Sequence, residues 1–346
     1  MMDIDLLAKT VQTNCHISDA QYAGHYSLCT FLLKMREYYR WEKRIPLSHI
    51  LAKSDVGAWI SQRESDWENF ESLSFDELEF NGQKFNPFQD DQINASINPH
   101  GYVYSGGYGI FGKPCFFLGE LTEKQQLDKL TVFISEREMA RDLAAPPAMI
   151  VGNTIYIRRE SLRRYLWEKI EEWKWKHDPD TPMGRTLDFY KNKLNTQDFE
   201  VILDAMCKNE TRSTMYHEIG EAKASELLGD QWRNLLAELP RSELELKLRA
   251  IKDHLADSIT TLPSLIEEKN LAALHFYFAN MTGMRKEIFP EALDAYKSWL
   301  KSARLSPLIN LYENSYNKWL TLAHKIIAVY QGNPGAWRQE IAKLVD

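Results

Sequence analysis

The chain has 346 residues, of which 44% are hydrophobic and 26% charged, and its formal net charge is −7 at pH 7. This length and mix are typical of a globular protein with room for two domains. The acidic balance argues against a general nucleic-acid-binding protein, which carries a basic footprint. No apolar run approaches the ~20 residues that span a bilayer, so no membrane partner is expected.

The cysteines and the N-terminal residues together predict that the protein is located in the cytoplasm. The four cysteines are widely spaced and form no CxxC pair, which is typical of free thiols in a reducing cytoplasm. The first residues carry acids and lack the apolar centre of a secretion signal. We therefore expect a soluble, cytoplasmic protein.

Helical spacing of apolar residues dominates residues 1–75. Between residues 15 and 44 apolar side chains recur every three or four positions, and Ser18 or Asp19 could cap the start of this helix. A second amphipathic helix is predicted through residues 56–70. The chain is thus expected to open with helices.

The pattern changes over residues 76–158, which are expected to form a small, mostly antiparallel sheet. Asn81-Gly82 is the strongest hairpin signal, since this dipeptide suits the tight turns that join neighbouring strands. Further strands are predicted in the glycine- and aromatic-rich segment 101–121, in 130–134 and in 154–157. Turns rather than crossover helices join them, which disfavours a parallel sheet.

Residues 159–177 are predicted to form a charged amphipathic helix, and 177–184 is the clearest linker because it combines two prolines and a glycine in a polar stretch. Helical periodicity then continues to the end of the chain. The predicted fold class is α+β: a mixed domain of residues 1–177, followed by an all-helical bundle of residues 185–346.

Three blocks together carry a resemblance to a known family. They are residues 14–42 (NCHISDAQYAGHYSLCTFLLKMREYYRWE), residues 101–121 (GYVYSGGYGIFGKPCFFLGEL), and RDLAAPPAM with TIYIRRESLRRYLWEKIEEW between 141 and 173. The chain resembles an uncharacterised family of bacterial proteins of unknown function. This resemblance implies a bacterial, cytoplasmic protein and brings no activity or catalytic residue.

The local pattern closest to a chemical site is His217-Glu218-Ile219-Gly220-Glu221 on a predicted helix. His217 and Glu221 lie one turn apart on the same face, so they could bind one metal ion or form an acid/base pair. The zincin signature HExxH would need a second histidine where Glu221 stands. The pair also resembles the HxxxE ligands of hemerythrin-like di-iron bundles, which take further ligands from neighbouring helices.

A second pair follows in the sequence. His254 and Asp257 stand three residues apart on a predicted helix, and His275 lies further on. We therefore predict a divalent metal site, with iron or zinc, formed by His217, Glu221, His254 and Asp257, with Glu218 as proton carrier. The alternative is that these are ordinary buried histidines beside surface carboxylates.

Three other segments were weighed as sites. A thiol at Cys15, near a predicted helix start, could be nucleophilic, but capping by Ser18 or Asp19 together with a buried small thiol explains the segment better. The glycine-rich residues 101–114 lack the ending of a P-loop, and tight turns account for them. The arginines at 158, 159, 163 and 164 alternate with glutamates, which is typical of a solvated, ion-paired helix face.

Two functions remain open from the sequence. One is an enzyme with a metal or acid/base site in the helical C-terminal half. The other is a non-catalytic interaction or scaffolding protein that uses its aromatic-rich sheet as a partner surface. A homo-oligomer or a protein partner is compatible with both, and the reaction is not specified.

Overall fold

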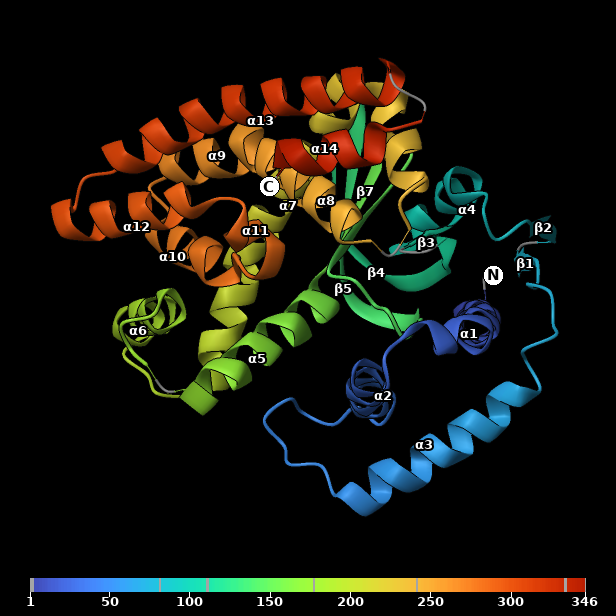
Figure 1. Cartoon of the computed structure of the whole chain (residues 1–346). Helices are drawn as coiled ribbons and strands as arrows, with labels where there is room; N and C mark the ends of the chain where they lie inside the picture. Colours follow the sequence, from blue (N-terminus) through green and yellow to red (C-terminus); the bar gives the residue numbers. More distant parts are fainter. Residues whose placement is uncertain are drawn as a thin grey trace. The chain divides into compact units, whose positions relative to one another are not determined.

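The computed structural model describes residues 3–80, 82–109, 112–176, 178–240, 242–332 and 335–345. The chain divides into two compact units, Met1–Trp167 and Glu168–Asp346. The predicted α+β class is confirmed: helices and sheets make up the first unit, and the C-terminal half is helical (Figure 1). Among the described residues, no helix combines the length and apolarity needed to cross a membrane.

The N-terminal helices begin earlier than the sequence pattern suggested, and the single helix predicted between residues 15 and 44 is wrong, because a short 3-10 turn at Ala23–His25 divides that range. Helix α1 spans Ile4–Tyr22, and Asp3 caps it by accepting a hydrogen bond from the backbone N–H of Leu6 at 3.0 Å. Ser18 and Asp19, predicted as caps, lie instead in its last turns and are buried. Helices α2 (Leu28–Glu42) and α3 (Lys53–Glu68) follow, and Ser27 caps α2.

A short antiparallel hairpin precedes the main sheet. Its strands are β1 (Leu78–Phe80) and β2 (Gln83–Phe85), as the turn signal predicted. Gly82 has φ of 75°, which a glycine adopts without strain, and Asn81 lies outside the described residues. Helix α4 (Asp90–Ile97) then packs on the first strand of the main sheet.

The main sheet has five strands in the order β3-β4-β5-β7-β6. The strands are β3 (Tyr102–Tyr108), β4 (Pro114–Leu127), β5 (Leu130–Arg141), β6 (Ala148–Val151) and β7 (Thr154–Arg158). All neighbours are antiparallel except β5 and β7, which pair in parallel. The sheet is therefore mostly antiparallel, with one parallel pair that strand composition alone did not predict.

Alternation along the strands gives the sheet two apolar faces. Phe116 and Leu118 of β4 belong to a core that includes Leu7 and Val11 of α1 and Ile93 of α4. The residues between them point the other way, and Phe117 packs there with Val103, Phe133 and Tyr156. Helix α1 thus covers one face of the sheet across β4 and β5.

Helix α5 (Arg159–Lys176) contains the division between the two units. In the predicted linker, His177 lies outside the described residues, and α6 (Pro182–Leu194) already begins at Pro182, with Thr181 as its cap. The last residues of the expected linker are therefore helical. The independent folding of residues 1–177 and 185–346 stays a prediction.

The second unit is a bundle around one large apolar core that includes Trp232, Trp299 and Trp319. Its longest element, α7 (Phe199–Ala237), bends at Gly229, whose φ of 66° is non-helical. The helices that follow are α8 (Glu243–Ala256), α9 (Leu262–Glu267), α10 (Leu271–Asn280), α11 (Gly283–Glu287), α12 (Pro290–Ser302), α13 (Ser306–Gly332) and α14 (Trp337–Val345). A π-helical segment, η4 (Asp257–Thr261), joins α8 to α9.

Candidate metal centre

The site depends on a close approach of α7 to the end of α8. A Cβ atom at Gly220 would overlap the carbonyl oxygen of Ala256 and the hydroxyl of Thr260, so only glycine fits there. Thr260 Oγ1 also donates a hydrogen bond to the carbonyl of Tyr216 at 2.7 Å, which ties η4 to α7. Gly220 lies between His217 and Glu221, and therefore brings their helix face against the neighbouring elements.

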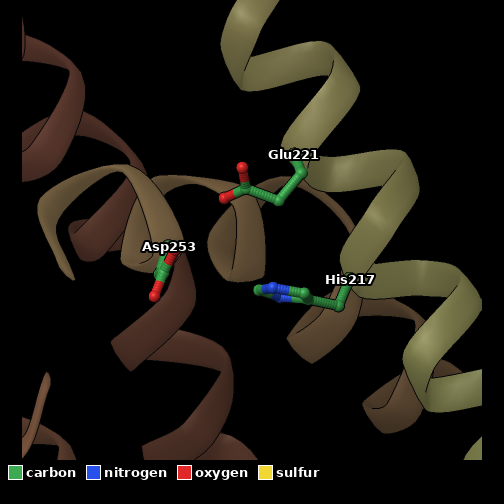
Figure 2. Close-up of side chains that lie close together, drawn as sticks. All are labelled: His217, Glu221 and Asp253. Carbon is green, nitrogen blue, oxygen red and sulfur yellow. The ribbon is translucent and has the colours of Figure 1, made fainter. Parts of the chain in front are cut away.

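Three side chains converge at this crossing. His217 and Glu221 point from α7 toward Asp253 of α8 (Figure 2), and one ligand atom from each lies within 4.8 Å of the other two. Ligands about 2.1 Å from a zinc ion lie about 3 to 4 Å from one another, so small side-chain movements would close this group around an ion. Among the described residues, no other group of three His, Cys, Asp or Glu side chains meets this distance.

Asp257 lies behind His217 rather than beside it as a further ligand. Its Oδ1 is 2.8 Å from Nδ1 of His217 and also accepts a hydrogen bond from Thr261 Oγ1 at 2.9 Å. The guanidinium of Arg285 contacts Oδ2. Burial alone would raise the pKa of Asp257, but Arg285 and His217 hold it well below its usual range. The carboxylate therefore stays charged and orients the imidazole.

The same contact determines the charge of His217. Burial would lower its pKa, but the charge of Asp257 and its hydrogen bond outweigh burial, and the pKa rises to about 9. Glu218 and Glu221 act in the same direction. With Nδ1 committed to Asp257, Nε2 is the ring nitrogen left for a ligand or a proton.

The two carboxylates of the group have different partners. Lys252 Nζ lies 2.6 Å from Oε2 of Glu221, whereas Oε1 is buried and has no hydrogen-bond partner within the described chain. Asp253 faces Nε of Arg285 at 3.8 Å. Burial raises the pKa of Asp253 to about 6, against the lowering effect of Arg285. Each carboxylate therefore has a neighbouring cation and an oxygen that can turn toward the centre.

His254, predicted as a ligand, is placed in the apolar core. Its ring is 1% exposed, stacks on Trp319 at a centroid distance of 5.2 Å and meets Phe289 edge-on at 4.8 Å. Its Nε2 lies 2.8 Å from the backbone oxygen of Arg285. Burial lowers the pKa of His254 to about 4, so the ring is neutral near pH 7. His275 likewise packs against Trp299 and lies 3.0 Å from the hydroxyl of Tyr296.

The structure thus brings together two of the four predicted ligands, places a third behind them, and moves the fourth away. Asp253 takes the position expected for His254, and the sequence reasoning missed it. The available signal was the spacing of Asp253 and Asp257, which stand four residues apart on one helix face. Glu218, the predicted proton carrier, adjoins the group in sequence, and burial raises its pKa to about 7.

The other segments weighed from the sequence have structural explanations. Cys15 lies inside α1, not at a helix start, and its thiol donates a hydrogen bond to the carbonyl of Phe116 at 3.2 Å. Burial raises its pKa, which opposes nucleophilic behaviour. Arg158 makes a two-point pair with Glu138 at 2.9 and 2.7 Å, as expected for ion pairing. Residues 110 and 111 of the glycine-rich segment lie outside the described residues.

Comparison with protein families gives two matches that together cover nearly the whole chain. Residues 6–158 match the N-terminal domain of a family of unknown function (DUF6866), and residues 163–346 match its C-terminal domain. The group of His217, Glu221 and Asp253 lies in the second of these domains. Searches of curated proteins and of solved structures returned no match.

Proposed function

We propose that this chain, which belongs to the family of unknown function (DUF6866), is a metal-binding protein whose helical C-terminal unit holds a divalent ion between His217, Glu221 and Asp253. The observation that carries the proposal is the convergence of these three side chains from two helices onto one point (Figure 2).

The ligand set limits the choice of metal. One imidazole and two carboxylates suit zinc, iron(II) or manganese, whereas thiolate-preferring ions would need cysteine. Three protein ligands leave at least one position open to water or substrate, which is typical of catalytic centres rather than of closed structural ones. A bound ion there would supply Lewis-acid chemistry to a substrate.

The surroundings support the same proposal. A metal-ligating histidine usually donates its other ring N–H to a carboxylate, which fixes the tautomer and raises the basicity of the ligand nitrogen. Asp257 stands in that position relative to His217. Lys252 and Arg285 contact the acidic side chains, so only small side-chain movements are needed to close the group around an ion.

The decisive experiment is elemental analysis of the full chain purified without a histidine tag, followed by calorimetric titration of the metal-stripped protein with Zn²⁺, Mn²⁺ and Fe²⁺. We expect one saturable site for at least one of these ions. His217→Ala and Asp253→Asn should abolish it while the helical circular dichroism is retained. His324→Ala and Glu313→Gln, which alter exposed side chains of α13, are the matched controls.

Two results would reject the proposal. One is wild-type protein that carries no metal and binds none of the three ions. The other is undiminished binding by His217→Ala. Either would favour the non-catalytic interaction or scaffolding role considered from the sequence.

A further inference from the structure

The N-terminal unit contains a cavity of about 630 Å³ that is separate from the metal-ligand group. Residues from α1, the end of α2 and the loop after it, the end of β5 and the first turns of α5 form its wall. Ligand sites for small organic molecules have volumes of about 300 to 1,000 Å³, so the size fits a metabolite.

Arginine is the most frequent residue type in this wall. Six arginines line the cavity together with five carboxylates. Three of the carboxylates are already paired with arginines that do not line it: Glu37 with Arg36, Glu42 with Arg63, and Glu138 with Arg158. Two of the lining arginines also have carboxylate partners, Arg40 with Glu37 and Arg137 with Glu120. Arginines still outnumber carboxylates in the wall, which favours an anion in the cavity.

Arg141 is a buried arginine of this wall. It is 2% exposed, yet its closest carboxylate oxygen, Oε2 of Glu138, is 4.0 Å away and is held at 2.7 Å by Arg158. Its Nε has no hydrogen-bond partner within the described chain, and one terminal nitrogen donates to the backbone oxygen of Glu37 at 3.3 Å. A buried guanidinium without a close carboxylate destabilises the folded protein unless an anion pairs with it.

The packing around Arg141 leaves its guanidinium oriented. Its central carbon lies 4.8 Å from the ring centroid of Trp41 and 5.6 Å from that of Tyr38, and these two rings stack on each other at 5.5 Å. Burial and the nearby charge of Arg164 lower the pKa of Arg141 to about 10, so it still carries its charge near pH 7. A fixed guanidinium fork matches phosphate and carboxylate oxygens.

The rest of the wall is suited to an organic group. Apolar side chains contribute beside the arginines, namely Ala8, Trp41, Ile45, Leu47 and Met139. A bare inorganic ion would fill only part of the volume. We propose that this cavity binds a small organic anion whose phosphate or carboxylate group pairs with Arg141 and whose apolar part contacts the loop after α2.

The test uses phenyl phosphate as the probe and follows its ³¹P resonance on titration with the full chain. EDTA is present throughout, so an ion in the C-terminal unit does not contribute. Benzoate is the competitor and is also titrated directly by calorimetry, which distinguishes a carboxylate ligand from a phosphate ligand. We expect saturable binding of at least one of the two probes, and displacement of phenyl phosphate by benzoate if both charged groups are accepted.

Leu47 offers a matched pair of variants on the loop rather than in the core. Leu47→Glu places a negative charge in the wall, whereas Leu47→Gln changes the shape in the same way without the charge. We expect roughly tenfold or greater weakening for Leu47→Glu relative to Leu47→Gln, since the added carboxylate repels the anion and competes with it for the arginines of the wall. Arg141→Gln should weaken binding similarly, and Lys84→Gln, which removes an exposed charge on the hairpin, should not.

The proposal is overturned if neither probe binds wild-type protein saturably, or if Leu47→Glu and Leu47→Gln bind the probes equally. The comparison of Leu47→Glu with Leu47→Gln tests anion binding in the cavity even if Arg141→Gln fails to fold. Since EDTA is present, failure of the metal proposal would leave these results unchanged.

Discussion

The Oδ1 atom of Asp257 lies 2.8 Å from Nδ1 of His217, and this contact joins η4 to α7 across forty residues of sequence. It leaves Nε2 of His217 as the nitrogen available to the group with Glu221 and Asp253. In the proposed metal centre, Asp257 therefore orients His217 instead of serving as a ligand itself.

Asp257→Asn tests this orienting role. The amide has nearly the same shape but lacks the charge that holds the Nδ1–H tautomer, so metal affinity should fall by about 10- to 100-fold without being lost. Calorimetric titration of the metal-stripped variant measures the change. Asp294→Asn, at an exposed position on α12, is the control. Unchanged affinity in Asp257→Asn would show that the contact has no part in metal binding.

Gly220→Ala tests the close approach of the helices. Alanine normally stabilises a helix interior by up to about 1 kcal/mol relative to glycine. At residue 220 the added methyl group meets the carbonyl of Ala256, so we expect a loss of about 1 to 3 kcal/mol instead, together with weaker metal binding. Gly57→Ala in α3, where a Cβ atom meets nothing within 4 Å, should stabilise the protein. Denaturant unfolding measures the change in the free energy of unfolding for both variants, and we expect opposite signs. The same change in both variants would contradict a close helix contact at Gly220.

Glu210 gives the folded protein a pH dependence. It is 2% exposed, and burial raises its pKa from 4.5 to about 8. The folded state therefore retains a proton that the unfolded chain releases, so stability from this group is full below the unfolded pKa of 4.5 and declines as pH rises toward about 8. Glu210→Gln should show a flatter profile over this range and, above it, greater stability than wild type, by an amount on the order of a few kcal/mol.

Urea unfolding at a series of pH values measures this difference. Glu313→Gln makes the same change in charge at an exposed position and should reproduce the wild-type profile. A Glu210→Gln profile parallel to that of wild type would mean that Glu210 is already ionised in the folded state near neutral pH.

The thiols should differ in reactivity. Cys29 is exposed, whereas Cys15, Cys115 and Cys207 are buried, and burial raises the pKa of both Cys15 and Cys115. Native protein should therefore show one fast-reacting thiol, and Cys29→Ser should remove it. After denaturation without reductant, all four should titrate. A lower count would indicate a disulfide and would contradict the expectation drawn from the sequence.

Short-range patterns predicted much of the fold because they act within one element. The period of apolar residues located α3 and the helical character of residues 15–44, and Asn81-Gly82 located the β1–β2 hairpin. The same period did not show that residues 15–44 divide between the end of α1 and α2. The pairing of β5 with β7 was not predictable in this way, since parallel alignment depends on how the chain returns to the sheet and not on the composition of either strand.

The candidate site, too, could be predicted from the sequence only as far as local spacing reaches. Helical spacing was enough to put His217 and Glu221 on one face, but the choice between Asp253 and His254 depends on a rotation of α8 by one residue. His254 continues the apolar stripe of Leu248, Ile251 and Leu255, and aromatic packing from α13 draws it into the core. Trp319 lies far along the chain, so its effect could not be read from the local sequence.

The strand order β3-β4-β5-β7-β6 also has a consequence for folding. Strands β6 and β7 are joined by a tight turn and can pair early, as can β3, β4 and β5, because each set makes contacts that are local in sequence. The seam between β5 and β7 forms only when the two pieces dock, from the pairing of Thr131 with Thr154 to that of Ser135 with Arg158. Native-state hydrogen exchange should therefore find the β6–β7 hairpin opening as a unit, at a lower free energy than the β3–β5 meander.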